Sequence, residues 1–185
     1  MSEFKLHDLN TAPEASRPLL EDSLQAFGMI PNLHAVMAES PALLKGYKKL
    51  HELFTQTSFT AAEQTVVWQA INVEHGCHYC VPAHTAIAKT MQVSDAVIDA
   101  LREETALPDA RLEALRRFTL RVVRQRGQIA AADLQAFIDA GYSRQHVGEV
   151  LLGVAQKVMS NYLNAIAETP VDQPFQKFVW RRSAA

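Results

Sequence analysis

The chain has 185 residues, of which 48% are hydrophobic and 21% are charged, and its formal net charge is −2. This composition is typical of a globular protein long enough to bury a sizeable core, and the near-neutral charge argues against nucleic acid or anionic lipid as a partner. No apolar run approaches the roughly 18 residues of a membrane-spanning helix. The first ten residues also lack the apolar core of a signal peptide, so we expect a cytoplasmic protein.

The first half of the chain carries repeated helix signals. Thr60 and Glu63 have the spacing of a capping box, in which each residue satisfies a backbone N–H of the other. Gly28 and Gly76 suit the left-handed residue that often follows a helix. Four helices are expected here: residues 14–27, a short helix after Pro31, a helix from Ser40 to about Thr57, and a helix from Thr60 to His75.

The second half continues the same pattern. We expect helices from Ser94 to about Glu103, within residues 109–127 and 131–141, and from Ser143 to about Glu168, with the aromatic segment 174–180 docking as a last short helix. No alternating apolar pattern with hairpin turns is present. The sequence therefore predicts an all-α fold of roughly eight to ten helices, arranged as a single domain over residues 1–185.

The stretch EHGCHYCVPAH, residues 74–84, contains both cysteines of the chain. Three interpretations are open: two cysteines packed as small hydrophobes, a zinc site, or a dithiol redox centre. The zinc site would use Cys77, Cys80, His84 and one of His75 and His78. We favour the redox centre, because the segment is polar, a second pair of metal ligands is not evident, and a reducing cytosol does not favour a permanent disulfide.

Pro82 predicts the local geometry of this stretch. Proline is tolerated in the first turn of a helix, so a helix should begin between Tyr79 and Pro82 and run to about Met91. Cys80 then lies at the helix N-terminus, where the helix dipole and free N–H groups favour a thiolate. His84 follows one turn later on the same face, where an imidazole can accept the thiol proton.

The segment FTAAEQTVVWQAINVEHGCHYCVPAHTAIAKT, with its capped helix followed by G-C-x-Y-C-x-x-x-H, resembles the alkylhydroperoxidase D-like (AhpD-like) family of the carboxymuconolactone decarboxylase superfamily. The likeness continues in IPNLHAVMAESPALLKGY before it and GVAQKVMSNYLNAIAETPVD after it. It covers most of residues 28–173 and is nearest to the peroxidase-related branch. The resemblance implies one AhpD-like all-α domain, with the carboxymuconolactone decarboxylase-like core at residues 40–125.

The resemblance also implies an antioxidant enzyme that reduces hydroperoxides without a metal or cofactor. Cys80 would attack the peroxide oxygen, Cys77 would condense with the resulting sulfenic acid to a disulfide, and His84 would relay the proton. A dithiol partner of unknown identity would restore the thiols. Family members are oligomeric, so a homo-oligomer (dimer, trimer or hexamer) is expected, with no nucleic-acid or membrane partner.

The chain departs from the family at one position. The family usually carries a proton-relay glutamate twelve residues before its first cysteine, and this chain has Thr65 there. Glu74 is our expected substitute in the relay. Glu63 is a second candidate for the relay or for lining the site, although capping its helix is the role that we favour for it.

Three further residues are candidates for lining the site. Asn161 and Asn164 match the family on the long last helix, and Tyr79 should pack against the pocket wall, with a hydroxyl that could face the substrate. Two rival functions remain open: a carboxymuconolactone decarboxylase-like enzyme, which has no evident need for paired thiols, and a non-enzymatic, zinc-stabilised oligomer.

Overall fold

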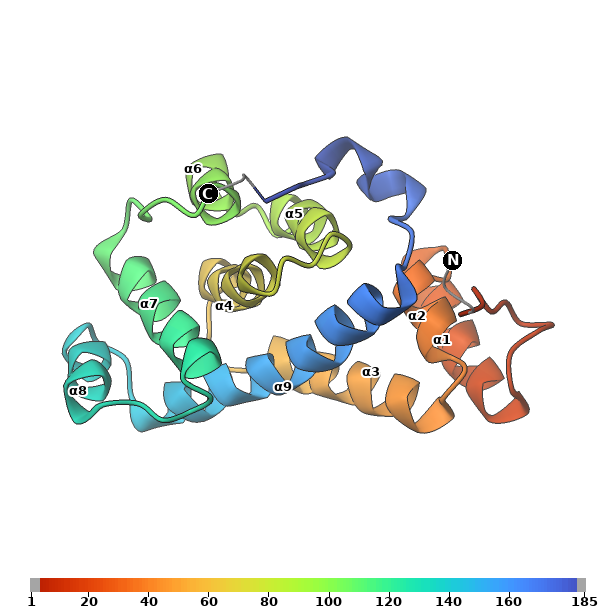
Figure 1. The fold of residues 1–185 in the computed structure, drawn as a ribbon, viewed down its shortest axis with the longest axis horizontal. Coiled ribbons are helices and arrows are strands. Elements are labelled where there is room, and N and C mark those ends of the chain that lie inside the picture. The colour runs from red at the N-terminus through yellow and green to blue at the C-terminus, as the bar shows by residue number, and fades with distance from the viewer. Residues whose placement is uncertain (1–3, 183–185) are drawn as a thin grey trace.

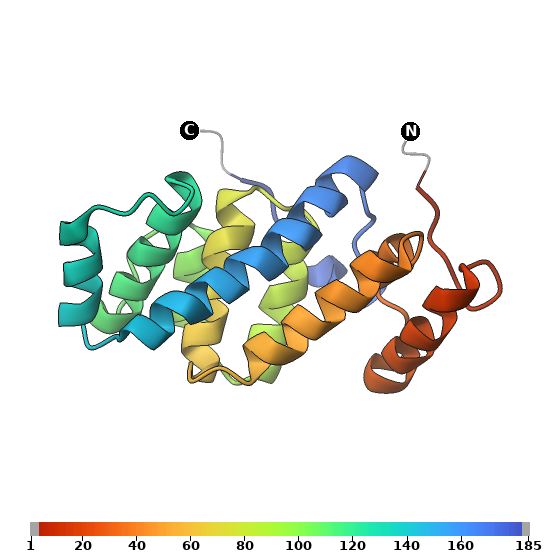
Figure 2. The ribbon, with the colours of Figure 1, turned by 90° about the horizontal axis from the view of Figure 1, so that it is seen from below.

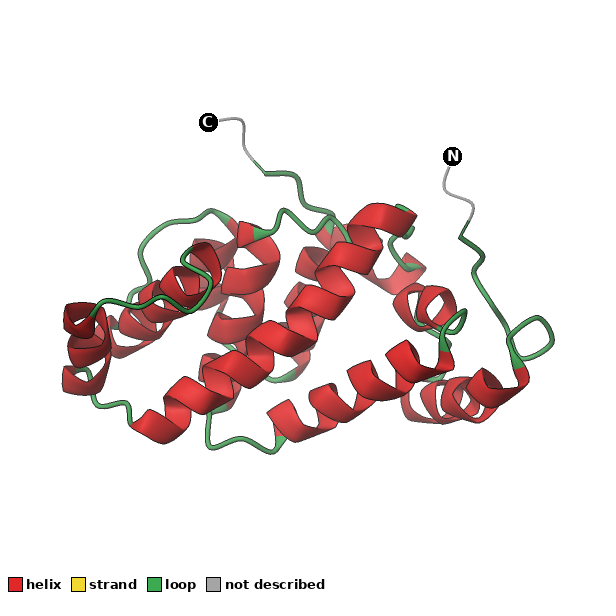
Figure 3. Ribbon diagram, turned by 60° about the horizontal axis from the view of Figure 1, so that its bottom comes forward, coloured by secondary structure: helices red, strands yellow, loops and turns green. Residues whose placement is uncertain are grey.

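In the computed structural model, which describes residues 4–182, the chain forms nine α-helices and two short 3-10 helices, and no strand occurs in that range (Figure 3). The all-α prediction is confirmed. The α-helices are α1 (Arg17–Phe27), α2 (Asn32–Met37), α3 (Pro41–Thr55), α4 (Ala61–Glu74), α5 (Cys80–Thr90), α6 (Asp95–Arg102), α7 (Ala110–Arg124), α8 (Ala131–Asp139) and α9 (Arg144–Ala167). The 3-10 helices are η1 (Glu14–Ser16) and η2 (Gln173–Phe178).

The long helix α9 runs between the two ends of the molecule, from α7 and α8 to α1 and α2 (Figure 1). Helix α3 packs along it, as Figure 2 shows from below. Helix α4 is the central element and contacts α5, α6, α7 and α9. Because α4 is covered on all these sides, its residues from Glu63 to Val73 are all buried.

Helix ends follow the predicted local signals. The Thr60 hydroxyl accepts a hydrogen bond from the Glu63 N–H, and the Glu63 carboxylate accepts one from the Thr60 N–H, so the predicted capping box is confirmed. Gly28 and Gly76 have φ values of 69° and 63°, a left-handed conformation that glycine adopts without steric cost. These stops separate α1 from α2 and α4 from α5.

Close packing of α9 against α3 and α4 depends on Gly153. A Cβ atom at this position would lie 2.7 Å from Val67 Cγ1 of α4 and 2.8 Å from a ring carbon of Phe54 of α3. Both neighbours belong to the main apolar core. A side chain here would therefore push α9 away from the two helices that it must contact.

Two helix predictions change in detail. The predicted helix 14–27 is divided into η1 and α1, because Pro18 occupies the first turn of α1 and favours a helix start there. The aromatic C-terminal segment docks as predicted, but as the 3-10 helix η2 packed on α5. None of the described helices combines the length and apolar character needed to cross a membrane.

Candidate active site

Helix α5 begins at Cys80, and Pro82 lies in its first turn, which confirms the predicted helix start. Cys77 lies in the turn just before α5. The cysteines are 3% and 2% exposed, respectively, and both are free thiols. The backbone N–H of Cys80 donates a hydrogen bond of 3.3 Å to Cys77 Sγ. The turn into α5 therefore brings the two sulfur atoms together in the core.

Helix α9 contributes Asn164, whose amide reaches both sulfur atoms. Its Nδ2 lies 3.3 Å from Cys80 Sγ and 3.9 Å from Cys77 Sγ. Asn161, one turn earlier, donates to Asn72 Oδ1 at 3.0 Å and lies 2.9 Å from His75 Nδ1 through its own Oδ1. Asn164 therefore contacts the thiols directly, and Asn161 supports the buried polar layer beside them.

His84 lies against a buried cation. The Nζ atom of Lys157, on α9, is 2.9 Å from His84 Nε2, and the Lys157 side chain is completely buried. An ammonium group can only donate, so Nε2 accepts and the ring hydrogen belongs on Nδ1. That Nδ1 atom is buried without a hydrogen-bond partner in the described part of the chain. The ring also packs on Trp68 of α4, with centroids 4.9 Å apart.

The two thiols differ in acidity. Burial alone would raise the pKa of Cys80, but a hydrogen bond with Cys77 and the positive charge of Lys157 outweigh burial and lower it. The pKa of Cys77 is raised, because its hydrogen bond with Cys80 and its burial both favour the neutral thiol. The pair therefore carries its thiolate on Cys80 and its proton on Cys77.

Three histidines beside the thiols are neutral at neutral pH. Burial, with the nearby charge of Lys157, holds the pKa of His84 well below its usual value. The same two causes lower the pKa of His51 to about 4. Burial and the charge of Lys48 lower the pKa of His34 to about 3. Lys157 is consequently the group whose positive charge acts on Cys80.

A pocket of about 660 Å³ opens onto Cys80, His84 and Lys157. Most of its walls are apolar or aromatic. The lining comes from α1, α2, α3, α5, α9 and η2 and includes Ala26, Phe27, Met29, Pro31, Leu33, Tyr47, Ala83, Ile87, Met91, Pro174 and Phe175. Its carboxylate is Asp22, an exposed side chain 3.7 Å from the Lys48 ammonium. The pocket thus suits an apolar molecule that presents one reactive end to Cys80.

Tyr79 forms part of the pocket wall, and its hydroxyl is occupied by structural hydrogen bonds. It donates to Asp172 Oδ2 at 2.5 Å and accepts from the Leu33 N–H at 3.2 Å. Asp172 also accepts from the Asn32 N–H at 3.0 Å. These bonds tie the C-terminal segment to α2 and α5, so Tyr79 positions the wall while its hydroxyl faces Asp172.

The two candidate carboxylates lie elsewhere. Glu74 forms a two-point ion pair with Arg124 of α7, at 2.7 and 2.9 Å, and does not line the pocket. Glu63 caps α4 and pairs with Arg111. The pairing with Arg124 and the absence of Glu74 from the pocket lining argue against Glu74 as the substitute for the family glutamate. Thr65 is buried, and its hydroxyl has no partner within residues 4–182.

Across residues 4–182, no group of three or more His, Cys, Asp or Glu side chains could hold a metal ion. The two histidines considered as zinc ligands have other partners: His75 contacts Asn161, and His78 contacts the Thr169 carbonyl at 2.9 Å. This placement argues against the zinc interpretation.

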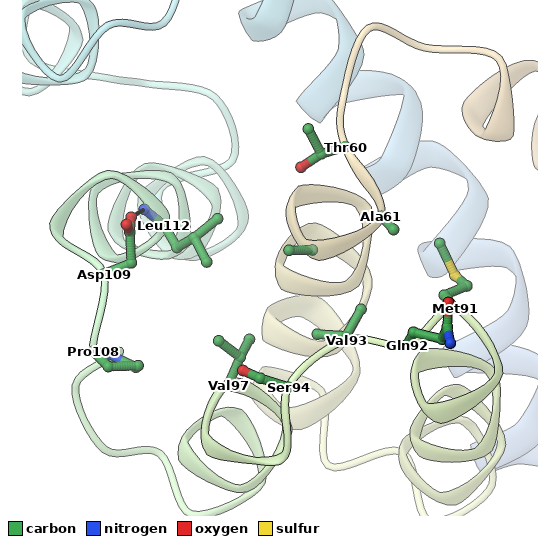
Figure 4. A pocket seen from close by; sticks show the side chains of 11 residues that line it. Thr60, Ala61, Met91, Gln92, Val93, Ser94, Val97, Pro108, Asp109 and Leu112 are labelled. Carbon is green, nitrogen blue, oxygen red and sulfur yellow. Dashed lines mark hydrogen bonds between the residues drawn. The ribbon is translucent and has the colours of Figure 1, made fainter.

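A second pocket, of about 570 Å³, lies where the start of α4 meets α6 and α7 (Figure 4). No cysteine or histidine lines it, and its one carboxylate, Asp109, caps α7 by accepting from the Leu112 N–H. Met91 borders both pockets, and neither thiol lines this one.

Sequence reasoning missed Lys157, and a signal for it was present. Lys157, Asn161 and Asn164 are spaced i, i+4 and i+7, which places them on one face of α9. Lys157 is the one lysine of this helix, and its place on the face that carries both asparagines indicates a buried charge. Gln156 was also missed; it accepts from Trp68 Nε1 at 2.8 Å and contacts His51 Nδ1 at 3.0 Å.

Comparison with known proteins shows the fold. An uncharacterized peroxidase-related protein from Ralstonia eutropha JMP134, described as an alkylhydroperoxidase AhpD core, is 21% identical with a TM-score of 0.83, over 94% of each chain. A peroxidase-related protein from Silicibacter sp. TM1040 is 16% identical with a TM-score of 0.79, over 94% of this chain and 92% of that one. A cysteine-to-alanine variant of the debrominase Bmp8, in complex with 2,3,4-tribromopyrrole, is 17% identical with a TM-score of 0.76. The match covers 96% of this chain and 97% of that one.

No family model matches the chain, and no curated protein matches its sequence. The structural matches establish that the chain has the AhpD-like fold, as its sequence motif predicted.

Proposed function

We propose that the protein is a thiol-dependent oxidoreductase that reduces hydroperoxides through a Cys77–Cys80 dithiol and disulfide cycle. One observation carries the proposal: two free, buried thiols of unequal acidity meet under the Asn164 amide and beside a large apolar pocket. A lowered thiol pKa at a helix N-terminus is the usual environment of a reactive cysteine. The AhpD-like fold of the peroxidase-related neighbours supports the same chemistry.

The proposed cycle assigns a role to each sulfur. The Cys80 thiolate attacks the terminal peroxide oxygen, the O–O bond breaks, and Cys80 becomes a sulfenic acid while an alcohol leaves. The Cys77 sulfur then attacks the Cys80 sulfur, which forms the disulfide and releases water. A dithiol partner reduces the disulfide by exchange. Cys80 is therefore the nucleophile, Cys77 the resolving residue, and His84 the group that moves protons.

Two cysteine variants test this assignment. Cys80→Ser should abolish consumption of cumene hydroperoxide in the presence of excess dithiothreitol. Cys77→Ser should allow one fast turnover and leave Cys80 as a sulfenic acid that dimedone traps. Trapping on Cys77 in a Cys80→Ser protein that still consumes peroxide would reverse the assigned roles.

A second candidate function uses the same thiols. The pocket volume of about 660 Å³ and its aromatic walls exceed the needs of a small peroxide, and one structural neighbour is a debrominase bound to a brominated pyrrole. A thiolate can take bromine from a bromoarene; Cys77 then displaces bromide as the disulfide forms, and the aryl carbanion takes a proton. Bromide release from 2,3,4-tribromopyrrole, measured beside hydroperoxide reduction, distinguishes the two activities.

A further inference from the structure

Lys157 is a buried cation without a carboxylate partner. Its side chain is completely buried on α9, and no Asp or Glu within residues 4–182 forms an ion pair with it. Its one hydrogen-bond partner there is His84 Nε2 at 2.9 Å. Burying an isolated ammonium group costs far more than one such bond returns, so a nearby anion would stabilise the charged form.

The titratable groups around Lys157 leave one source of negative charge. They are His51 and Tyr47 of α3, His84 and Cys80 of α5, and Cys77 in the preceding turn. The histidines are neutral, Tyr47 keeps its proton because burial raises its pKa, and Cys77 also keeps its proton. The Cys80 thiolate is therefore the anion that balances Lys157, and the reduced site carries one positive and one negative charge.

We propose that Lys157 is the proton source for peroxide reduction and acts through His84, in the role of the carboxylate that Thr65 replaces. This inference rests on the proposed hydroperoxide reductase function. Lys157 Nζ donates to His84 Nε2, so the opposite ring nitrogen, Nδ1, carries a hydrogen. That N–H has no partner in the described chain, and His84 lines the same pocket as Cys80, so the N–H is the donor we assign to a leaving oxygen at Cys80.

Protons and electrons balance in the resulting step. The Cys80 thiolate bonds to the terminal oxygen of R–O–O–H, the O–O bond breaks, and RO⁻ leaves. His84 Nδ1 gives its proton to RO⁻, which becomes ROH, while Nε2 takes a proton from the Lys157 ammonium. The site then holds a neutral sulfenic acid and a neutral amine. When the dithiol donor later reduces the disulfide, the Cys80 proton returns to Lys157.

A lysine suits this step better than a carboxylate would. Oxidation removes the negative charge of Cys80, and an ammonium that kept its proton would be left buried without an anion. Loss of the Lys157 proton removes the positive charge at the same time. The pocket therefore remains neutral overall before and after oxidation, and the cost of an unpaired buried charge helps to drive the proton toward the leaving oxygen.

The test compares two oxidants in the same enzyme sample. An alkyl hydroperoxide releases an alkoxide, a poor leaving group that needs a proton, whereas a peroxycarboxylic acid releases a carboxylate that does not. Lys157→Gln keeps a donor toward His84 Nε2 but has no proton to give, and Lys157→Met removes both. We expect each variant to lose about 10²–10⁴-fold in its single-turnover rate with cumene hydroperoxide and little with peracetic acid.

Both rates are measured at a pH at which Cys80 is fully ionised in each variant, established from the ultraviolet absorbance of the thiolate. The ratio of the two rates within one sample does not depend on how much of the protein is folded. Lys49→Met, which removes an exposed lysine paired with Glu52 on α3, is the matched control and should keep the wild-type ratio.

Equal slowing with both oxidants, or an unchanged ratio in the Lys157 variants, would overturn the proton relay and leave the proposed function standing. A wild-type protein that reacts with neither oxidant would overturn the proposed function and the relay with it.

Discussion

Two sulfur atoms three residues apart have opposite environments in this protein. Cys80 occupies the first position of α5, and the positive charge of Lys157 helps to lower its pKa. Cys77 lies in the preceding turn and retains its proton. The sequence predicted the first half of this difference, because Pro82 fixes the helix start. The contribution of Lys157 was not predicted, since a residue 77 positions away from Cys80 reaches it only through tertiary packing.

The difference in acidity predicts the order of alkylation. The pKa of Cys80 is lowered in the folded protein, so its thiolate should persist as the pH falls below the usual range for a cysteine, until the pH passes the lowered value. With iodoacetamide at mildly acidic pH, peptide mass spectrometry should find Cys80 labelled before Cys77. The urea-unfolded protein is the control, in which both cysteines should react over the same pH range. Earlier labelling of Cys77 would show that the thiolate is on Cys77 and that the assignment to Cys80 is wrong.

Single helices were predictable wherever local chemistry decides the structure. Helix α4 is an example, because the capping box of Thr60 and Glu63 defines its start and Gly76 follows its end. Local signals did not predict the ion-pair partners of Glu63 and Glu74, which are Arg111 and Arg124 of α7, respectively. The sequence placed both carboxylates on α4, but their pairing with arginines of α7 depended on how α7 packs.

Helix α4 provides a stability prediction. Burial raises the pKa of the Glu63 carboxyl, but hydrogen bonds from Thr60 and the charge of Arg111 outweigh burial and hold the pKa below its usual value. The ionised group therefore stabilises the fold above its unfolded pKa, and this contribution disappears as the pH falls through the lowered folded pKa. Glu63→Gln should reduce the free energy of unfolding by about 0.5–2 kcal/mol at neutral pH.

Urea titrations of Glu63→Gln and wild type at neutral and acidic pH measure this contribution. The difference between the two proteins should shrink in acid. Glu74→Gln serves as the comparison, because it breaks a half-exposed pair with Arg124 and should cost less. A loss for Glu63→Gln that stayed constant down to strongly acidic pH would show that the carboxylate charge contributes nothing.

The whole molecule assembles its candidate site from distant parts of the chain. The pocket draws walls from α1 at one end of the sequence and from η2 at the other, around the thiols of α5. The resemblance to the AhpD-like family predicted the fold and singled out the stretch that holds both thiols. The volume and lining of the pocket could not be predicted, because periodicity within a helix does not determine which helices meet.

Assembly beyond one chain stays a prediction. Helix α9 exposes Tyr162 and Ile166, which are 53% and 66% exposed, and these apolar side chains are consistent with the expected homo-oligomer. Neither residue lines the pocket.

In the proposed cycle, Cys77 and Cys80 together give two electrons to each hydroperoxide molecule. The most direct measurement adds one equivalent of cumene hydroperoxide to the fully reduced protein, counts the remaining thiols, and maps the peptides. We expect both thiols to disappear for each peroxide consumed and a Cys77–Cys80 disulfide to be recovered, which dithiothreitol reduces. Two titratable thiols beside unreacted peroxide would contradict it.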